Sequence, residues 1–160
     1  MQLLQNTPIL DEIMKYLVGF AQRSTCHRSK CGSIIVDNCD SEYFKILGVG
    51  YNSMPCNEEG ECFKDSLSPT FKSDKTCCIH AEQRAIIDCL KMYPSKIEGS
   101  HLFFIRLDDE DKPKISGAPY CSICSKMALD VGIATFHLWH EAGWTGYDTK
   151  EYNDFTFQRQ

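Results

Sequence analysis

The hydrophobic positions near the start of the chain recur with the spacing of a helix. After Pro8, apolar residues return every three or four positions as far as Ala21, which predicts an amphipathic helix with one face toward a core. Thr7 can cap this helix, because Pro8 then occupies its first turn. Residues 31–36 and 43–51 are rich in β-branched and aromatic side chains and are separated by turn-forming residues. These two segments predict a β-hairpin.

Further along, helical and extended patterns alternate. The expected elements are a helix over residues 80–92 stopped by Pro94, a strand over 101–107, a helix over 121–131 ended by Gly132, and a strand over 133–139. Residues 141–160 show no clear period, and only Phe155-Thr156-Phe157 suggests a short strand there. This order predicts a single α/β domain over residues 1–160, a three-layer α/β/α sandwich with a mixed five-stranded sheet.

The segment from residue 53 to residue 76 is polar and rich in helix and strand breakers. We expect a long functional loop that carries at most a short helix. Residues 108–117 form a second, charged excursion.

Composition narrows the class of protein. A chain of 160 residues with 42% hydrophobic content can bury one core. The first ten residues lack a signal-peptide pattern, and no stretch approaches the roughly 18 apolar residues of a membrane span. Ten cysteines in 160 residues make up about 6% of the chain, which is below the roughly 8–10% typical of a small disulfide scaffold. The cysteines also cluster near histidines. We therefore expect a soluble, cytoplasmic protein whose cysteines serve metal and thiol chemistry, with disulfides left open as an alternative.

The formal net charge of -5 argues against extensive binding to nucleic acid phosphates. A small-molecule substrate is favoured, although Arg23, Arg28 and Lys30 form a local basic strip.

Two short motifs carry the candidate chemistry. His80 and Glu82 are separated by one residue at the start of a predicted helix, and Cys121 and Cys124 open another. One nitrogen and two sulfur ligands suit a tetrahedral zinc with an open fourth position, where bound water has its pKa lowered toward about 7. The amino termini of both predicted helices carry partial positive charge, which favours the thiolate forms of Cys121 and Cys124. The motifs therefore predict a catalytic Zn2+ site.

Glu82 projects differently from His80, so its expected role is proton transfer rather than metal binding. Alone, Cys121-x-x-Cys124 could also belong to a zinc ribbon or a redox pair. A redox pair makes no use of His80 and Glu82, and the ribbon lacks a second pair of equal spacing.

Together these motifs resemble the cytidine deaminase superfamily of zinc-dependent nucleobase deaminases. Residues 48–55, Gly-Val-Gly-Tyr-Asn-Ser-Met-Pro, resemble a loop of deoxycytidylate (dCMP) deaminases. The resemblance spans residues 26–136 and implies hydrolytic deamination of a cytosine nucleotide or nucleoside to the uracil product, with release of ammonia.

The resemblance also assigns roles. His80, Cys121 and Cys124 would bind zinc, Glu82 would carry protons, Asn52 would bind sugar or base, and the Ala81 backbone would face the base carbonyl. The backbone before the first cysteine would receive the leaving amino group. A purely structural alternative for Asn52 is that it is a turn residue after a strand.

Three departures from the family pattern stand out. Tyr120 intervenes between Pro119 and Cys121, residues 106–117 are longer and more charged than expected, and residues 133–139 lack basic side chains. His137, Trp139 and His140 could line the pocket instead, although a tryptophan at a strand end more often belongs to a core.

The other cysteines resemble a second, structural zinc site of some viral deoxycytidylate deaminases. Cys26 and Cys62 match its positions, and the remaining ligands would come from Cys56, Cys77, Cys78, Cys31 or His27. Such a site would hold the long loop. The alternative is buried free thiols.

Two other functions remain open from sequence. One is a deaminase acting on a base within RNA or single-stranded DNA, or on another free nucleobase or nucleoside. The other is a catalytically silent, zinc-stabilised binding module, for which the Glu82 carboxylate has no use. The resemblance implies a homo-oligomer without membrane attachment.

Overall fold

The computed structural model describes residues 1–26, 28–39, 43–57 and 78–158. The described helices are α1 (Pro8–Ala21), η1 (Pro55–Asn57), α2 (Ala81–Met92), η4 (Pro94–Lys96), α3 (Ser122–Asp130) and α4 (Thr149–Phe157). The strands are β1 (Gln2–Leu3), β2 (Cys31–Val36), β3 (Ile46–Tyr51), β4 (His101–Leu107), β5 (Pro113–Lys114), β6 (Thr135–His140) and β7 (Gly143–Asp148).

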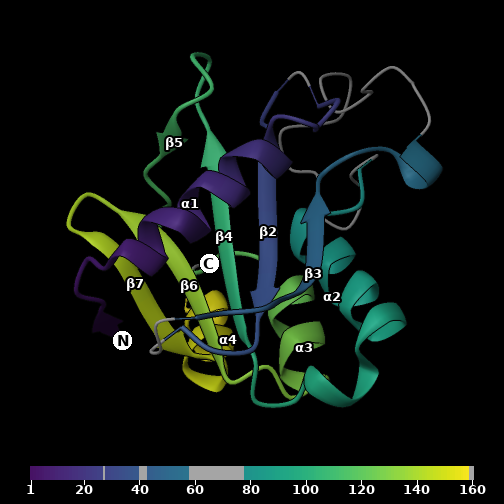
Figure 1. Ribbon diagram of the computed structural model, residues 1–160, viewed down its shortest axis with the longest axis vertical. Helices are drawn as coiled ribbons and strands as arrows, with labels where there is room; N and C mark the ends of the chain where they lie inside the picture. Colours follow the sequence, from purple (N-terminus) through teal and green to yellow (C-terminus); the bar gives the residue numbers. More distant parts are fainter. Residues whose placement is uncertain (27, 40–42, 58–77, 159–160) are drawn as a thin grey trace.

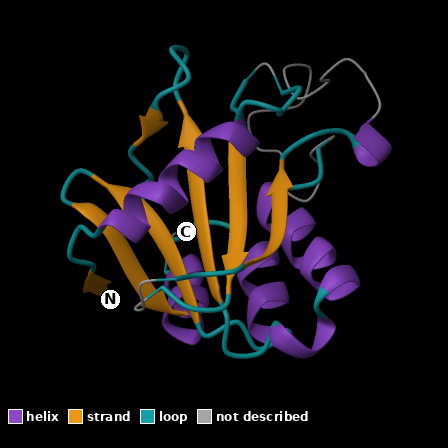
Figure 2. Cartoon of the chain, viewed as in Figure 1, coloured by secondary structure: helices purple, strands orange, loops and turns teal. Residues whose placement is uncertain are grey.

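The strands form one twisted sheet (Figures 1 and 2). Its order is β1-β7-β6-β4-β2-β3, with β5 paired to β4. Strands β4 and β6 run parallel, whereas the other pairs are antiparallel. The predicted mixed sheet is confirmed, but it has seven strands rather than five. The difference arises because two-residue strands, β1 and β5, pair along β7 and β4, and two residues are too few to show a sequence pattern.

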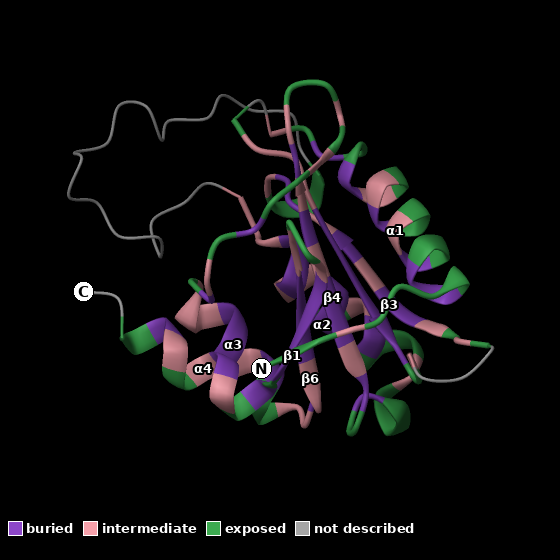
Figure 3. Ribbon diagram, turned by 90° about the vertical axis from the view of Figure 1, so that its left-hand side faces the viewer, coloured by how far each residue is buried: buried purple, intermediate pink, exposed green. Residues whose placement is uncertain are grey.

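Helices cover both faces of the sheet, which confirms the α/β/α layers. Helix α1 lies on one face, where Ile13 and Leu17 pack with Ile34 and Phe103. Its outward side is exposed to solvent (Figure 3). Thr7 caps it by accepting a hydrogen bond from the backbone N–H of Leu10 at 3.4 Å, as the sequence predicted.

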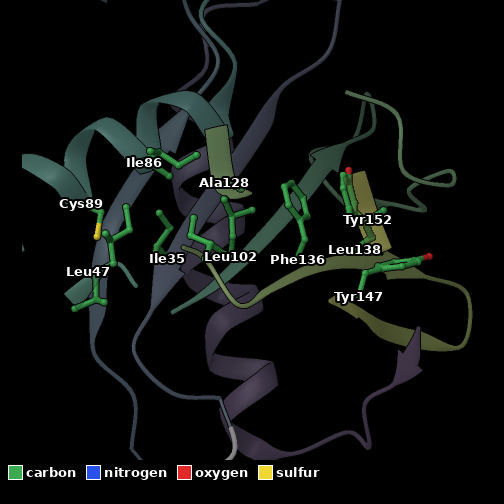
Figure 4. Packing of buried hydrophobic residues seen from close by; sticks show 13 residues of the cluster. Ile35, Leu47, Ile86, Cys89, Leu102, Ala128, Phe136, Leu138, Tyr147 and Tyr152 are labelled. Atoms are coloured by element: carbon green, nitrogen blue, oxygen red, sulfur yellow. The ribbon is translucent and has the colours of Figure 1, made fainter. Parts of the chain in front are cut away.

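Helices α2, α3 and α4 lie on the other face. The core there joins Ile86 of α2, Ala128 of α3 and Tyr152 of α4 to Leu102 and Phe136 of the sheet (Figure 4). The Tyr152 ring stacks on Phe136 with centroids 3.9 Å apart. Each helix buries an apolar stripe against the sheet, and this burial is the main favourable term that holds the layers together.

The last twenty residues differ from the expectation. Phe155-Thr156-Phe157 belongs to helix α4, not to a strand, and an unpredicted strand, β7, precedes it. Asp148 starts the helix by accepting hydrogen bonds from the backbone N–H groups of Lys150 and Glu151. Strand β7 escaped detection because it is buried on both faces and so shows no polar alternation.

Candidate active site

The site lies where helices α2 and α3 begin. His80 is the N-cap of α2 and Cys121 is the N-cap of α3. The backbone N–H of Ile79 donates to the Ser53 carbonyl at 2.9 Å, just after β3 ends. This bond fixes the position at which the chain enters α2. The His80–Glu82 motif and the Cys121–Cys124 motif thus meet at the site from two different helices.

Three potential metal ligands converge there. The Nδ1 atom of His80 lies 3.4 Å from Cys121 Sγ and 3.3 Å from Cys124 Sγ, and the two sulfur atoms are 3.2 Å apart. One imidazole and two thiols at these separations suit a tetrahedral zinc with one open position. The donor set therefore fits the metal that the sequence predicted.

The two thiols are unequal. The hydrogen bond with Cys124 lowers the pKa of Cys121 to about 4, and the hydrogen bond with His80 acts in the same direction. Conversely, the hydrogen bond with Cys121 and burial raise the pKa of Cys124. Without a metal, Cys121 is therefore the more acidic thiol of the pair, and it also accepts a hydrogen bond from the Cys124 backbone N–H at the start of α3. Zinc would bind both sulfur atoms as thiolates.

Glu82 lies beside this cluster in the first turn of α2. Its side chain is buried, with 6% of the residue exposed. Burial raises the pKa of its carboxyl to about 7, and the nearby His80 partly offsets this effect. A carboxyl group with a pKa near the working pH can both accept and donate a proton.

A cavity of about 470 Å³ opens beside these residues. His80, Glu82 and Cys121 line it, together with residues from several other parts of the fold. The remaining lining residues are Cys26, Arg28, Ser29, Cys31, Asn52, Cys78, Ala81, Phe104, Arg106, Ser116, Gly117, Ala118, Tyr120, Leu138 and Tyr152.

Asn52 lines the cavity, but its side chain also organises the neighbouring chain. Its Oδ1 atom accepts hydrogen bonds from the backbone N–H of Cys31 at 2.7 Å and from Ser24 Oγ at 2.8 Å. Its Nδ2 atom donates to the Ser29 carbonyl at 2.8 Å. Asn52 therefore links Ser24, Ser29 and Cys31, of which Ser29 and Cys31 line the cavity, and is more than a turn residue.

Of the other predicted substrate contacts, two line the cavity and one does not. Ala81 is buried and lines the cavity, and Tyr120 lines it while 72% exposed. Pro119 is buried and does not line it. Tyr120, which directly precedes Cys121, therefore lies at the solvent-exposed edge of the cavity.

The predicted second zinc site is only partly visible. Cys62, Cys77 and His27 lie outside the described residues. Cys26, Cys31 and Cys78 line the same cavity, whereas Cys56 is exposed. Within the described ranges, these four cysteines do not form a group of three ligands, and no disulfide joins the cysteines that the structure describes. This site remains a prediction.

The structure adds cavity residues that the sequence did not indicate. Arg106 and Phe104 come from β4, Leu138 from β6 and Tyr152 from α4. Arg106 lies within the predicted strand over residues 101–107, and Tyr152 lies within a segment that shows no clear period. Neither residue was therefore a candidate from the sequence. A signal existed for Arg106: it is the one charged residue in the apolar run from residue 101 to residue 107.

Basic side chains do reach the cavity, though not from residues 133–139. Arg28 and Arg106 line it, whereas His137, Trp139 and His140 do not. The suggestion that these three residues line the pocket is wrong. For His137 and Trp139 the reason is the alternation of side chains along β6: Phe136 and Leu138 face α2, α3 and α4, while His137 and Trp139 face the opposite side.

Fold and site together are those of a metal-dependent hydrolase. Residues 8–139 match the model of the cytidine and deoxycytidylate deaminase zinc-binding region. The chain therefore belongs to the cytidine and deoxycytidylate deaminase family, and it is a zinc-dependent hydrolase of the deaminase type. A comparison with curated proteins finds no match.

Solved structures agree. The dCMP deaminase from the cyanophage S-TIM5 in apo form is 24% identical, with a TM-score of 0.60 over 96% of this chain and 94% of that chain. The same enzyme in complex with dCMP and dUMP is 26% identical, with a TM-score of 0.53 over 82% of each chain. A cytidine deaminase from Burkholderia pseudomallei shares the fold at 9% identity, with a TM-score of 0.55 over 89% of this chain and 94% of that one. No helix among the described residues is long and apolar enough to cross a membrane.

Proposed function

We propose that the protein deaminates a cytosine nucleotide of the deoxycytidylate type, with zinc bound by His80, Cys121 and Cys124. The observation that carries this proposal is the convergence of these three ligand atoms beside the buried Glu82 at one cavity. In the reaction, water adds to C4 of cytosine, the bond from C4 to the amino nitrogen breaks, and uracil and ammonia are formed.

The chain's own residues would divide the work. When bound, zinc supplies the Lewis acidity that makes water a nucleophile near neutral pH. Glu82 takes a proton from that water and passes it to N3 of the base. It then takes the second proton from the hydroxyl newly bonded to C4 and gives it to the leaving amino group, so that the C4 carbonyl and ammonia form. Its burial favours both transfers, because a carboxyl with a pKa near 7 gives up and takes up a proton at similar cost.

A nucleotide, rather than a nucleoside, is supported by the basic side chains. Arg28 and Arg106 line the cavity from two different segments, and guanidinium groups pair well with phosphate oxygens. The S-TIM5 enzyme binds dCMP and dUMP, which supports the same substrate class here. Asn52 would act on the sugar mainly through the cavity-lining residues Ser29 and Cys31, which it holds in place.

The test is ammonia release by the zinc-loaded protein from dCMP, deoxycytidine, CMP and a short single-stranded oligonucleotide that contains cytosine. We expect dCMP to give the highest kcat/KM. Preference for the oligonucleotide would replace this proposal with a nucleic acid deaminase. Ammonia release from none of them, by protein shown to contain zinc, would favour a silent binding module.

We also propose that the protein works as a homo-oligomer. The outward side of α2 carries Ile87 and Leu90, each 40% exposed, and Met92 is 62% exposed at its end. Clusters of exposed apolar side chains mark contact surfaces. Light scattering coupled to gel filtration tests this proposal, and a monomer at micromolar concentration would refute it.

A further inference from the structure

A second group of metal-binding side chains lies away from the active site. Cys39, His101 and His137 each offer a ligand atom, and these atoms lie within 4.8 Å of one another. His101 begins β4, whereas Arg106, five positions further along the same strand, lines the active-site cavity. Five residues of strand span roughly 17 Å. The group is therefore at the other end of the sheet. His137 stacks on Phe103, which belongs to the core on the face that α1 covers (Figure 1).

The two imidazole rings are held in place by their surroundings. The Thr135 hydroxyl lies 2.7 Å from His101 Nδ1 and 2.6 Å from His137 Nε2. The His137 ring stacks on Phe103 with centroids 4.1 Å apart and planes inclined by 9°. Gly146 leaves room for this ring, because a Cβ atom there would lie 2.9 Å from His137 Nδ1. Ring orientation is thus fixed before any ligand binds, which lowers the entropic cost of binding.

The composition of the group suits a transition metal. Two imidazoles and one thiol match zinc and cobalt, whereas magnesium and calcium prefer oxygen ligands. His137 is 2% exposed, so its ring lies among packed side chains.

We propose that Cys39, His101 and His137 bind a divalent transition metal ion of the zinc type, at a site separate from the catalytic zinc. The ion would connect the segment after β2, where Cys39 lies, to the starts of β4 and β6. Sites of this kind contribute folding free energy. The role is structural, because the deamination proposed above needs none of these three residues.

The test counts metal ions in the full chain. Metal-free protein is loaded with Zn2+, unbound metal is removed, and zinc per chain is measured by elemental analysis for the unsubstituted protein, Cys39→Ser and His101→Gln. His140→Gln is the matched control, since His140 ends the same strand, β6, outside the group. We expect Cys39→Ser and His101→Gln to bind one zinc ion fewer than the unsubstituted protein and the control, with dCMP deamination unchanged.

Cobalt provides an independent readout. Cys39→Ser should lose part of the sulfur-to-Co2+ charge-transfer absorption, while the contribution of Cys121 and Cys124 stays. Thermal unfolding checks that each variant folds, and added Zn2+ should raise its Tm less than that of the control. Equal zinc content in the unsubstituted protein, Cys39→Ser and His101→Gln would overturn the proposal, whether or not the protein deaminates any substrate.

Discussion

A Cβ atom at Gly50 would lie 2.1 Å from the carbonyl oxygen of Ala81. Strand β3 therefore approaches the first turn of α2 more closely than any side chain allows. Gly48 repeats the relationship one helical turn further on, at 2.3 Å from the Ala85 carbonyl oxygen. Because His80 and Glu82 flank Ala81, the two glycines set how deeply the catalytic helix start lies against the sheet.

Gly50→Ala should therefore damage both stability and activity. Overpacking against a backbone atom costs about 1–3 kcal/mol in the free energy of unfolding, and the helix start must shift to relieve it. Urea unfolding and dCMP turnover measure the two effects. Gly19→Ala is the control, since Gly19 in α1 has no atom near an added Cβ, and it should stabilise the protein by roughly 0.5–1 kcal/mol. Equal effects of both substitutions would contradict the close approach.

Glu82→Gln should keep zinc and lose turnover. The amide fills the same space but cannot carry the proton, so kcat should fall by roughly a hundredfold to ten-thousandfold. Zinc content by elemental analysis and single-turnover kinetics with dCMP separate binding from chemistry. Glu141→Gln, at an exposed carboxylate outside the cavity, provides the control and should behave as the unsubstituted protein. Full activity in Glu82→Gln would remove this residue from proton transfer.

Arg106→Gln should reduce the preference for a nucleotide over a nucleoside. A lost charge-assisted contact costs about 1.5–3 kcal/mol, so KM for dCMP should rise roughly tenfold or more, while kcat/KM for deoxycytidine stays unchanged. Arg23→Gln is the matched control, because Arg23 lies over the Tyr51 ring and does not line the cavity. A parallel loss with both substrates would show that Arg106 acts on the fold instead of the phosphate.

Asn52→Ala should destabilise the protein as well as weaken binding. The substitution leaves the Cys31 N–H and the Ser29 carbonyl without their present partner, and each such buried group costs about 1–3 kcal/mol. Ser24→Ala removes only one hydroxyl from the same network and should cost less. Thermal unfolding without substrate compares the two variants. An unchanged Tm in Asn52→Ala would mean that Asn52 serves the substrate alone.

Tyr152→Phe should separate the ring of this residue from its hydroxyl, which has a hydrogen bond with the backbone of Tyr120. The phenylalanine ring retains the stacking on Phe136, so stability should stay within about 1 kcal/mol. Loss of the hydrogen bond beside Cys121 should change kcat/KM for dCMP by roughly fivefold. Tyr152→Ala, by contrast, should cost about 3–5 kcal/mol. Thermal unfolding and dCMP turnover measure the two effects, and an equal loss of stability in both variants would contradict the packing role of the ring.

Much of the fold was predictable because its elements carry one strong pattern each. Helix α1 shows a clean apolar stripe and a cap, and strands β2 and β4 are short buried runs between breakers. Strand β7 and helix α4 were not predictable for opposite reasons. The strand mixes glycine and aromatic residues without alternation, and the helix buries two threonines where an apolar stripe would be expected.

The candidate site was also predictable only in part. The sequence alone indicated His80, Glu82, Cys121 and Cys124, because metal ligands and a nearby carboxylate at helix starts have characteristic spacing. It did not indicate the cavity wall, since Phe104, Arg106 and Leu138 are brought together only by strand pairing. His137 shows the limit most clearly: its distance from the cavity follows from the face of β6 on which it lies, and that face depends on register.

Tyr152 separates two properties of this fold, metal binding and enclosure of the cavity. The metal ligands lie at the starts of α2 and α3, whereas part of the cavity wall comes from Tyr152 of α4, which packs on Phe136. Local opening of α4 would therefore remove part of the wall around a substrate while the metal ligands stay in place. Activity would then be lost before the metal is released.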